Sequence, residues 1–195
     1  MPNLLSYKQE LYRKYVHISS SIIPILLLIL GKDTFLPLIL ITSLLFLMFD
    51  LARKHNKFLK IIFYKLFGTM ARPHEATYLT GASWVFISAV ICIIIFNEKV
   101  AFIALLIVSL SDSSAAIIGI KYGKTKLLKK SLEGSIAFLI TTFFIIYTFS
   151  NTSFVTILCA SLVITISELI SSIKFNDNLI VPITAAILLT LAGVK

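Results

Sequence analysis

Seven apolar stretches, separated by short polar segments, run along the 195-residue chain. Roughly 20 helical residues cross the hydrocarbon core of a bilayer, so each stretch is close to the length of a membrane-spanning helix. We therefore expect an all-α, polytopic membrane protein with about seven transmembrane helices, folded as a single integral membrane domain over residues 1–195. The expected spans are residues 16–30, 35–49, 78–96, 101–120, 132–149, 154–173 and 179–194.

The composition excludes the other common classes of protein. Hydrophobic residues make up 58% of the chain and charged residues 14%, against about 45–50% and about 25% in soluble domains. A chain of this length cannot bury such an apolar excess in its own core. A soluble enzyme, a disordered protein and a disulfide-stapled secreted domain are therefore excluded.

The basic residues predict the orientation. With seven spans and the amino terminus inside, only Lys32, Lys99 and Lys195 of the 18 Lys and Arg residues fall on the outer side. Cytoplasmic loops are enriched in basic residues, so we expect a cytoplasmic amino terminus and an outer carboxyl terminus, in the cell inner membrane if the source is bacterial. This asymmetry explains much of the net charge of +9, so we expect no nucleic-acid partner. The sequence indicates no oligomeric state.

Residues 10–17 form a polar amphipathic leader to the first span. Its ionisable residues recur at a spacing that places them on one helical face. They are Glu10, Arg13, Lys14 and His17. Two interpretations stay open: the face anchors the helix at the interface with long charged side chains, or it turns toward a cytoplasmic site.

A second cytoplasmic segment, residues 53–77, is expected to lie in the membrane interface. It contains apolar residues at i, i+3, i+4 and i+7 together with nearby lysines, the pattern of a basic amphipathic helix on an anionic leaflet. The apolar residues are Leu59, Ile62, Phe63 and Leu66. A polar group closes the segment, formed by Arg72, His74 and Glu75.

Two acids lie well inside expected spans, Asp112 and Glu168. Charges in a bilayer are costly, so each is a functional candidate. At 1.5 Å per residue, they lie about 12 Å and about 7–8 Å from the cytoplasmic edge. The alternative is that each is a neutral or paired residue that bridges helices. Four serines around Asp112 favour a hydrated pocket there: Ser109, Ser111, Ser113 and Ser114.

The loop at residues 119–135, GIKYGKTKLLKKSLEGS, is the richest segment of the chain. It combines lysines with glycines, which permit close backbone approach, and it leads into a helix that starts at Ser131–Ser135. Free N–H groups at a helix start bind phosphates, so the loop is a candidate polyphosphate cradle; an ordinary basic loop would explain the lysines but not the glycines. Walker A is rejected, because three residues separate Gly119 from Gly123 and a membrane span precedes them.

Hard oxygen ligands for Mg²⁺ also gather on the cytoplasmic side. Asp177 lies between two asparagines, and with Asp112 and Glu133 it offers the ligand type that Mg²⁺ prefers. Residues 10–17, 72–81, 112–135 and 168–178 would all lie on this one side. We therefore expect a single active site at the cytoplasmic interface.

The order of these motifs resembles a known family, the CTP-dependent lipid kinases that include dolichol kinase, phytol kinase and the yeast-type diacylglycerol kinase. It is more distantly similar to the phosphatidate cytidylyltransferases. The matching residues are Glu10, Arg13, Lys14 and His17; Arg72, Glu75, Thr80 and Gly81; Asp112, Ala115, Gly119 and Tyr122-Gly123-Lys124; Lys130-Ser131-Leu132-Glu133-Gly134-Ser135; and Glu168, Asp177-Asn178 and Pro182.

The resemblance implies CTP as the phosphoryl donor, a divalent cation such as Mg²⁺, and a membrane lipid alcohol as the acceptor: a polyprenol or dolichol, a phytol-like alcohol or diacylglycerol. It implies that residues 130–135 bind CTP and that Asp112 is the essential acid. Phosphatidate cytidylyltransferase activity is the alternative, and a non-catalytic transporter is a further one.

The resulting hypothesis assigns a role to each candidate residue. The catalytic residues are Asp112, Glu168 and His17. The nucleotide-binding residues are Gly119, Gly123, Lys124, Lys129, Lys130, Ser131, Glu133, Gly134 and Ser135. The substrate or phosphate contacts are Arg13, Lys14, Arg72, Glu75 and Asn178, and the metal ligands are Asp112, Glu133 and Asp177.

Overall fold

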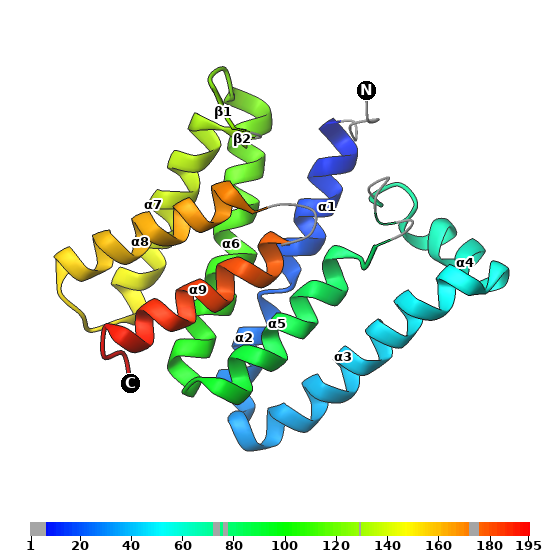
Figure 1. Cartoon of the computed structure of the whole chain (residues 1–195), viewed down its shortest axis with the longest axis horizontal. Helices are drawn as coiled ribbons and strands as arrows, with labels where there is room; N and C mark the ends of the chain where they lie inside the picture. The colour runs from blue at the N-terminus through cyan, green and yellow to red at the C-terminus, as the bar shows by residue number, and fades with distance from the viewer. Residues whose placement is uncertain (1–6, 72–74, 76–77, 129, 172–175) are drawn as a thin grey trace.

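A computed structural model of the chain describes residues 7–71, 75, 78–128, 130–171 and 176–195. Within these residues the protein is helical apart from one short hairpin (Figure 1). The helices are α1 Tyr7–Ser19, α2 Ile22–Leu30, α3 Lys32–His55, α4 Lys57–Phe67, α5 Gly81–Ile95, α6 Glu98–Tyr122, α7 Leu132–Phe149, α8 Phe154–Ile170 and α9 Asp177–Leu191; the strands are β1 Lys126–Leu127 and β2 Lys130–Ser131. The all-α prediction is confirmed.

Four helical segments in the described residues are long and apolar enough to cross a membrane. They are Tyr7–Leu30, Lys32–His55, Glu98–Tyr122 and Leu132–Phe149. Helices α5, α8 and α9 are apolar but shorter. The structure thus supports an integral membrane protein, while the number of seven spans and their orientation stay predictions.

Helix α6 is the centre of the bundle, and α1, α2, α5, α7 and α9 all pack against it (Figure 1). Its residues from Val100 to Val108 are all buried, so it has no solvent-facing stripe in that stretch. A helix that is apolar all round belongs in a core. The helix begins at Asn97, whose side chain accepts a hydrogen bond from Val100 N at 2.8 Å.

The first hydrophobic segment is broken into α1 and α2 at Ser20 and Ser21. Pro24 accounts for the break, because proline has no N–H to donate to the carbonyl four residues earlier and its ring crowds that carbonyl. The Ser20 carbonyl instead accepts from Ile23 N at 3.0 Å. The polar leader therefore belongs to a helix of its own, α1, rather than preceding the span expected at residues 16–30.

Helix α3 is longer than the expected span at residues 35–49, because both of its ends are polar. Asp33 lies in its first turn and Arg53 in its last, charges that oppose the partial charges of the helix dipole. Gly31, with φ of 73°, makes the sharp turn from α2. The expected amphipathic helix is present as α4, which begins at Asn56; its place in the membrane interface stays a prediction.

Candidate active site

A cavity of about 390 Å³ lies among α1, α3, α4, α5, α6 and α9. One end of it is lined by ionisable and polar side chains that come from distant parts of the sequence. They are Arg13, Lys14, His17, Asp50, Glu75, Asp112, Asp177 and Asn178. The fold thus brings seven of the predicted site residues to one place, together with Asp50, which was not predicted.

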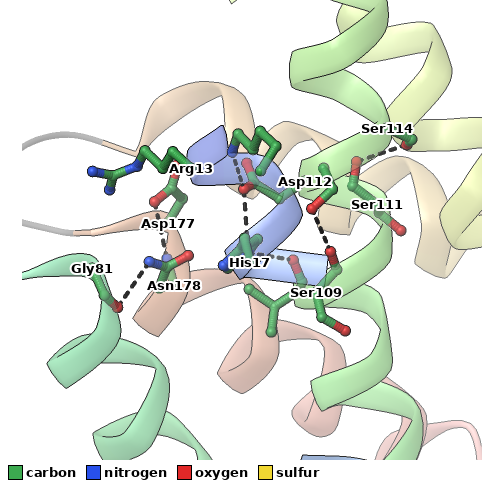
Figure 2. Close-up of polar contacts among 12 residues, drawn as sticks. Arg13, His17, Gly81, Ser109, Ser111, Asp112, Ser114, Asp177 and Asn178 are labelled. Carbon is green, nitrogen blue, oxygen red and sulfur yellow. Dashed lines mark hydrogen bonds and ion pairs between the residues drawn. The ribbon is translucent and has the colours of Figure 1, made fainter. Parts of the chain in front are cut away.

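Helix α1 turns its charged face toward Asp112 in the middle of α6 (Figure 2). Lys14 Nζ lies 2.5 Å from Asp112 Oδ2, and the two residues are only 6% and 7% exposed. His17 Nε2 lies 3.3 Å from the same carboxylate oxygen and 3.0 Å from the Val108 carbonyl oxygen. Burial of both charges demands a partner for each. Of the two interpretations of the leader, the structure favours a face turned toward a site.

Arg13 begins a chain of polar contacts that crosses the cavity to α9. Arg13 Nη1 donates to Glu75 Oε1 at 2.9 Å, which also accepts from Gly81 N at 3.3 Å. Asn178 Nδ2 donates to the Gly81 carbonyl at 3.1 Å (Figure 2). A Cβ at Gly81 would lie 2.8 Å from Arg13 Nη2, so a larger residue here would displace the Arg13 guanidinium. The four residues form one connected unit.

Asp50 at the end of α3 holds the segment that carries Glu75. Its carboxylate accepts from Arg53 Nε at 2.6 Å, Thr80 N at 2.7 Å and Ser83 Oγ at 2.6 Å. Arg53 in turn donates to the Glu75 carbonyl at 2.8 Å. Sequence reasoning missed Asp50 because the expected span ended one residue earlier. An acid three residues before an arginine at the end of an apolar run was the available signal.

Glu168 lies beside Lys130, and neither residue is among those that line the cavity. The Lys130 ammonium pairs with the Glu168 carboxylate, donates to the Glu168 carbonyl at 2.9 Å and lies 3.7 Å from Asp177 Oδ2. Glu168 is 2% exposed, and within the described residues its Oε2 has no hydrogen-bond partner. Lys130 therefore links the hairpin to Asp177, an acid that lines the cavity.

The hairpin and the start of α7 form a second cluster of the predicted residues. Strands β1 and β2 pair antiparallel, with Lys126 opposite Ser131. Ser131 caps α7 by accepting from Gly134 N at 3.2 Å, which confirms the expected helix start. Glu133 Oε1 accepts from Lys124 N at 3.0 Å and from Thr125 N at 3.2 Å, so it braces the loop.

The glycines of this loop have a packing role. A Cβ at Gly119 would lie 2.7 Å from Ser131 Oγ, and one at Gly134 would lie 2.8 Å from the Ala115 carbonyl oxygen. A Cβ at Gly123 would lie 2.8 Å from Ser131 Cβ. These glycines therefore let the end of α6 meet the start of α7. Their expected contact with a nucleotide stays a prediction.

Two of the serines around Asp112 serve the α6–α7 contact, Ser109 and Ser113 donate to carbonyls of their own helix, and none of the four is among the residues that line the cavity at Asp112. Ser111 Oγ accepts from Thr142 at 3.0 Å, and Ser114 Oγ lies 2.9 Å from Thr141 Oγ1 (Figure 2). The hydrated pocket around Asp112 that the serines favoured is thus replaced by helix packing on this side. The cavity lies on the side of α6 that faces α1.

The remaining predicted residues divide as follows. Arg72 and Lys129 lie outside the described residues. Lys124 is exposed on the hairpin, and Ser135 Oγ donates to the Ser131 carbonyl at 3.1 Å. Within the described part of the chain, no group of three or more His, Cys, Asp or Glu residues could hold a metal ion. The trio of Asp112, Glu133 and Asp177 is therefore not assembled there, and Mg²⁺ stays a prediction.

Comparison with known proteins yields three relatives. No family model and no solved structure matches the chain. The uncharacterized protein RP860 of Rickettsia prowazekii is 30% identical over 184 residues, covering 90% of each chain. The uncharacterized protein MJ1137 of Methanocaldococcus jannaschii is 29% identical over 186 residues, 93% of each chain.

The third relative, CTP-dependent diacylglycerol kinase 1 of Saccharomyces cerevisiae, has a named activity. It is 34% identical over 136 residues, which cover 67% of this chain but 47% of the yeast enzyme. The chain thus spans about half the length of that relative. By its match to RP860 over nearly all of both sequences, the chain belongs to the RP860 family, and it is distantly similar to the yeast CTP-dependent diacylglycerol kinase.

Proposed function

We propose that the protein is a lipid kinase that transfers the γ-phosphoryl group of CTP to the hydroxyl of a membrane lipid alcohol. The observation that carries the proposal is the buried Lys14–Asp112 pair, with His17 beside it, at the polar end of an otherwise largely apolar cavity. A lipid alcohol has the matching chemistry, a small polar head on an apolar body. The distant similarity to a CTP-dependent diacylglycerol kinase supports both the donor and the type of acceptor.

The charged end of the cavity is suited to activating a hydroxyl. In the proposed reaction the acceptor oxygen attacks the γ-phosphorus of CTP, the bond to the β-phosphate oxygen breaks, and CDP leaves. Asp112 accepts the hydroxyl proton as general base, while Lys14 and His17 orient its carboxylate. Phosphoryl transfer depends mainly on positioning and charge neutralisation, and both helices that supply these groups are rigidly packed.

The hairpin and the start of α7 are the proposed CTP site. The positive end of the α7 dipole and the exposed ammonium of Lys124 offer positive charge to phosphate oxygens. Lys130 reaches from the hairpin to Asp177, which lines the cavity. A triphosphate bound at the hairpin would therefore have a charged path toward the acceptor hydroxyl.

Among the described residues, the acids near Lys130 do not by themselves assemble a three-ligand site for a divalent cation. The Glu168 Oε2 atom is buried without a hydrogen-bond partner among the described residues. The Asp177 carboxylate lies 3.7 Å from Lys130 Nζ, which also pairs with Glu168. Carboxylate oxygens are the ligands Mg²⁺ prefers. We infer that Mg²⁺ would bind together with CTP, held by phosphate oxygens and by one or two of the candidate carboxylates, Asp112 and Asp177, and would neutralise phosphate charge there. Glu133, whose Oε1 braces the hairpin, is the weaker candidate.

We also propose that this site faces the cytoplasm, with seven spans. Most of the basic residues fall on the side expected to be inside. The hairpin and the Tyr7 end of α1 lie toward one end of the bundle, and the carboxyl end of the described chain lies at the other (Figure 1). An odd number of spans has this arrangement.

A product analysis tests the proposed function. Purified protein in detergent is supplied with γ-³²P-CTP, Mg²⁺ and either polyprenol, phytol, diacylglycerol or phosphatidate. Label in a lipid monophosphate with release of CDP supports the proposal; label released as pyrophosphate identifies a cytidylyltransferase instead. Asp112→Asn should abolish transfer, and Asp33→Asn, an exposed acid of α3, should not.

A further inference from the structure

The cavity continues from its charged end into an apolar limb. Five phenylalanines contribute to this part of the wall: Phe46, Phe49, Phe63, Phe67 and Phe86. We propose, on the basis of the proposed function, that this limb binds the hydrocarbon chain of the acceptor, with the reactive hydroxyl at Asp112. Ligand pockets in proteins are typically apolar with a few convergent polar groups.

The position of the limb supports a chain that enters from the side. Helix α1 packs on α6, whereas α3 packs on α5 and α4, so the limb lies between two groups of helices (Figure 1). Val16 and Ile22 on one rim and Phe67 on the other are 54%, 53% and 42% exposed. These exposed apolar side chains offer a hydrocarbon chain a route between the rims from the surrounding lipid.

The walls of the limb are fixed before any ligand binds. Phe46 of α3 stacks on Phe86 of α5, with 4.5 Å between the ring centroids. The Arg53 guanidinium lies 4.0 Å from the centroid of the Phe63 ring, which places that phenylalanine of α4. Since Arg53 also binds Asp50 and the Glu75 carbonyl, the apolar limb and the charged end share one scaffold.

Hydrocarbon fits this limb better than a polar ligand does. The phenylalanine rings offer no hydrogen-bond partners, so a polar group placed among them would lose its hydration without compensation. The charged end, only a short way along the same cavity, supplies donors and acceptors for the head of the molecule. The combination selects an amphiphile with its polar group at one end.

Photo-crosslinking locates the chain without relying on catalysis. The full-length protein in nanodiscs is irradiated with a diacylglycerol analogue that carries a diazirine near the middle of one acyl chain. We expect adducts on α3, α4 and α5 residues that line the limb. The variant Ala82→Trp, at an exposed alanine of the cavity wall, should lose most of these adducts; Ala52→Trp, at an exposed alanine away from the cavity, should keep them.

Kinetics on the same variants complete the test. Filling the limb should lower kcat/KM for the long-chain acceptor by about tenfold or more, with CTP binding unchanged. Adducts confined to the outer faces of α7 and α8, or equal kinetics for the two variants, would overturn the chain site while leaving the kinase intact. Adducts in the limb without phosphoryl transfer to any alcohol would support the chain site and overturn the proposed function instead.

Discussion

The buried Lys14–Asp112 pair gives the sharpest test of how this protein is held together. Lys14→Met leaves the Asp112 carboxylate buried with only His17 beside it, and Asp112→Leu leaves the Lys14 ammonium without its carboxylate. Removal of one partner of a buried ion pair costs about 3–5 kcal/mol, because an uncompensated charge stays buried. Lys14→Met should be the milder of the two changes, since His17 Nε2 still lies 3.3 Å from the Asp112 carboxylate.

The double variant, Lys14→Met with Asp112→Leu, separates the interaction energy of the pair from the contribution of each residue alone. With Met and Leu at the two positions no charge is left unpaired, and replacement of a buried pair by apolar residues is often neutral or stabilising. The free energy of unfolding should therefore recover most of what the single variants lose. Activity should not recover, because the proposed general base is gone.

The measurement is SDS-induced unfolding in mixed micelles, followed by the fluorescence of Trp84, the single tryptophan of the chain. Lys8→Met, at an exposed lysine of the same helix, is the matched control and should change the free energy of unfolding by less than about 1 kcal/mol. If Lys14→Met costs no more than this control, or if the double variant loses the sum of the two single losses, the coupling inferred from the structure is wrong.

Three further predictions concern the surroundings of the site. Asp50→Ala should cost about 3–5 kcal/mol of unfolding free energy by stranding a buried arginine and should lower activity, whereas the control Asp33→Ala should do neither in the same assays. Gly134→Ala should destabilise by about 1–3 kcal/mol and weaken CTP binding measured by isothermal titration. Gly119→Ala should cost less, because its obstacle is a hydroxyl that can rotate and not a backbone carbonyl. Phosphatidate, which is anionic, should compete poorly with diacylglycerol in the kinase assay; equal competition would contradict repulsion of an anionic acceptor by the acids of the site.

The sequence predicted the apolar helices and the acids inside them, because length and the cost of charge in lipid are local properties. The face of α1 was also readable, since Arg13, Lys14 and His17 follow helical spacing. The partner of this face could not be predicted. Helical spacing places Lys14 on the face, but it does not show that Asp112, 98 residues away in the sequence, contacts it. The structural role of Asp50 could not be predicted either, because it depends on contacts with Thr80 and Ser83 that only tertiary packing creates.

The packing role of the loop glycines could not be predicted from the sequence for a related reason. Lysines and glycines before a helix start are typical of phosphate cradles, and that pattern cannot distinguish a glycine that faces a ligand from one that faces another helix. Gly119 and Gly134 face each other's helices, with Ser131 between them. The glycine pattern predicted a close approach to the backbone, but it could not show that the approaching group is another helix.

The charges of the site explain how two substrates of opposite character could share it. Among the described residues, each base at the cavity or its edge is paired with an acid: Arg13 with Glu75, Lys14 with Asp112, Arg53 with Asp50 and Lys130 with Glu168. Asp177 adds a further negative charge. Such a balanced, slightly acidic cluster would repel an anionic acceptor such as phosphatidate and accept a neutral alcohol.

A triphosphate needs the opposite environment, and the hairpin provides it. Exposed lysines lie on and next to it, at positions 121 at the end of α6, 124 before β1 and 126 on β1. Lys130 belongs to the hairpin by its backbone and to the cavity by its side chain, because its ammonium lies at Glu168 and Asp177. The anionic donor and the neutral acceptor would therefore bind in separate electrostatic surroundings and meet at Lys130. This arrangement is suited to phosphoryl transfer from CTP to an alcohol. It is poorly suited to an acceptor that already carries a phosphate.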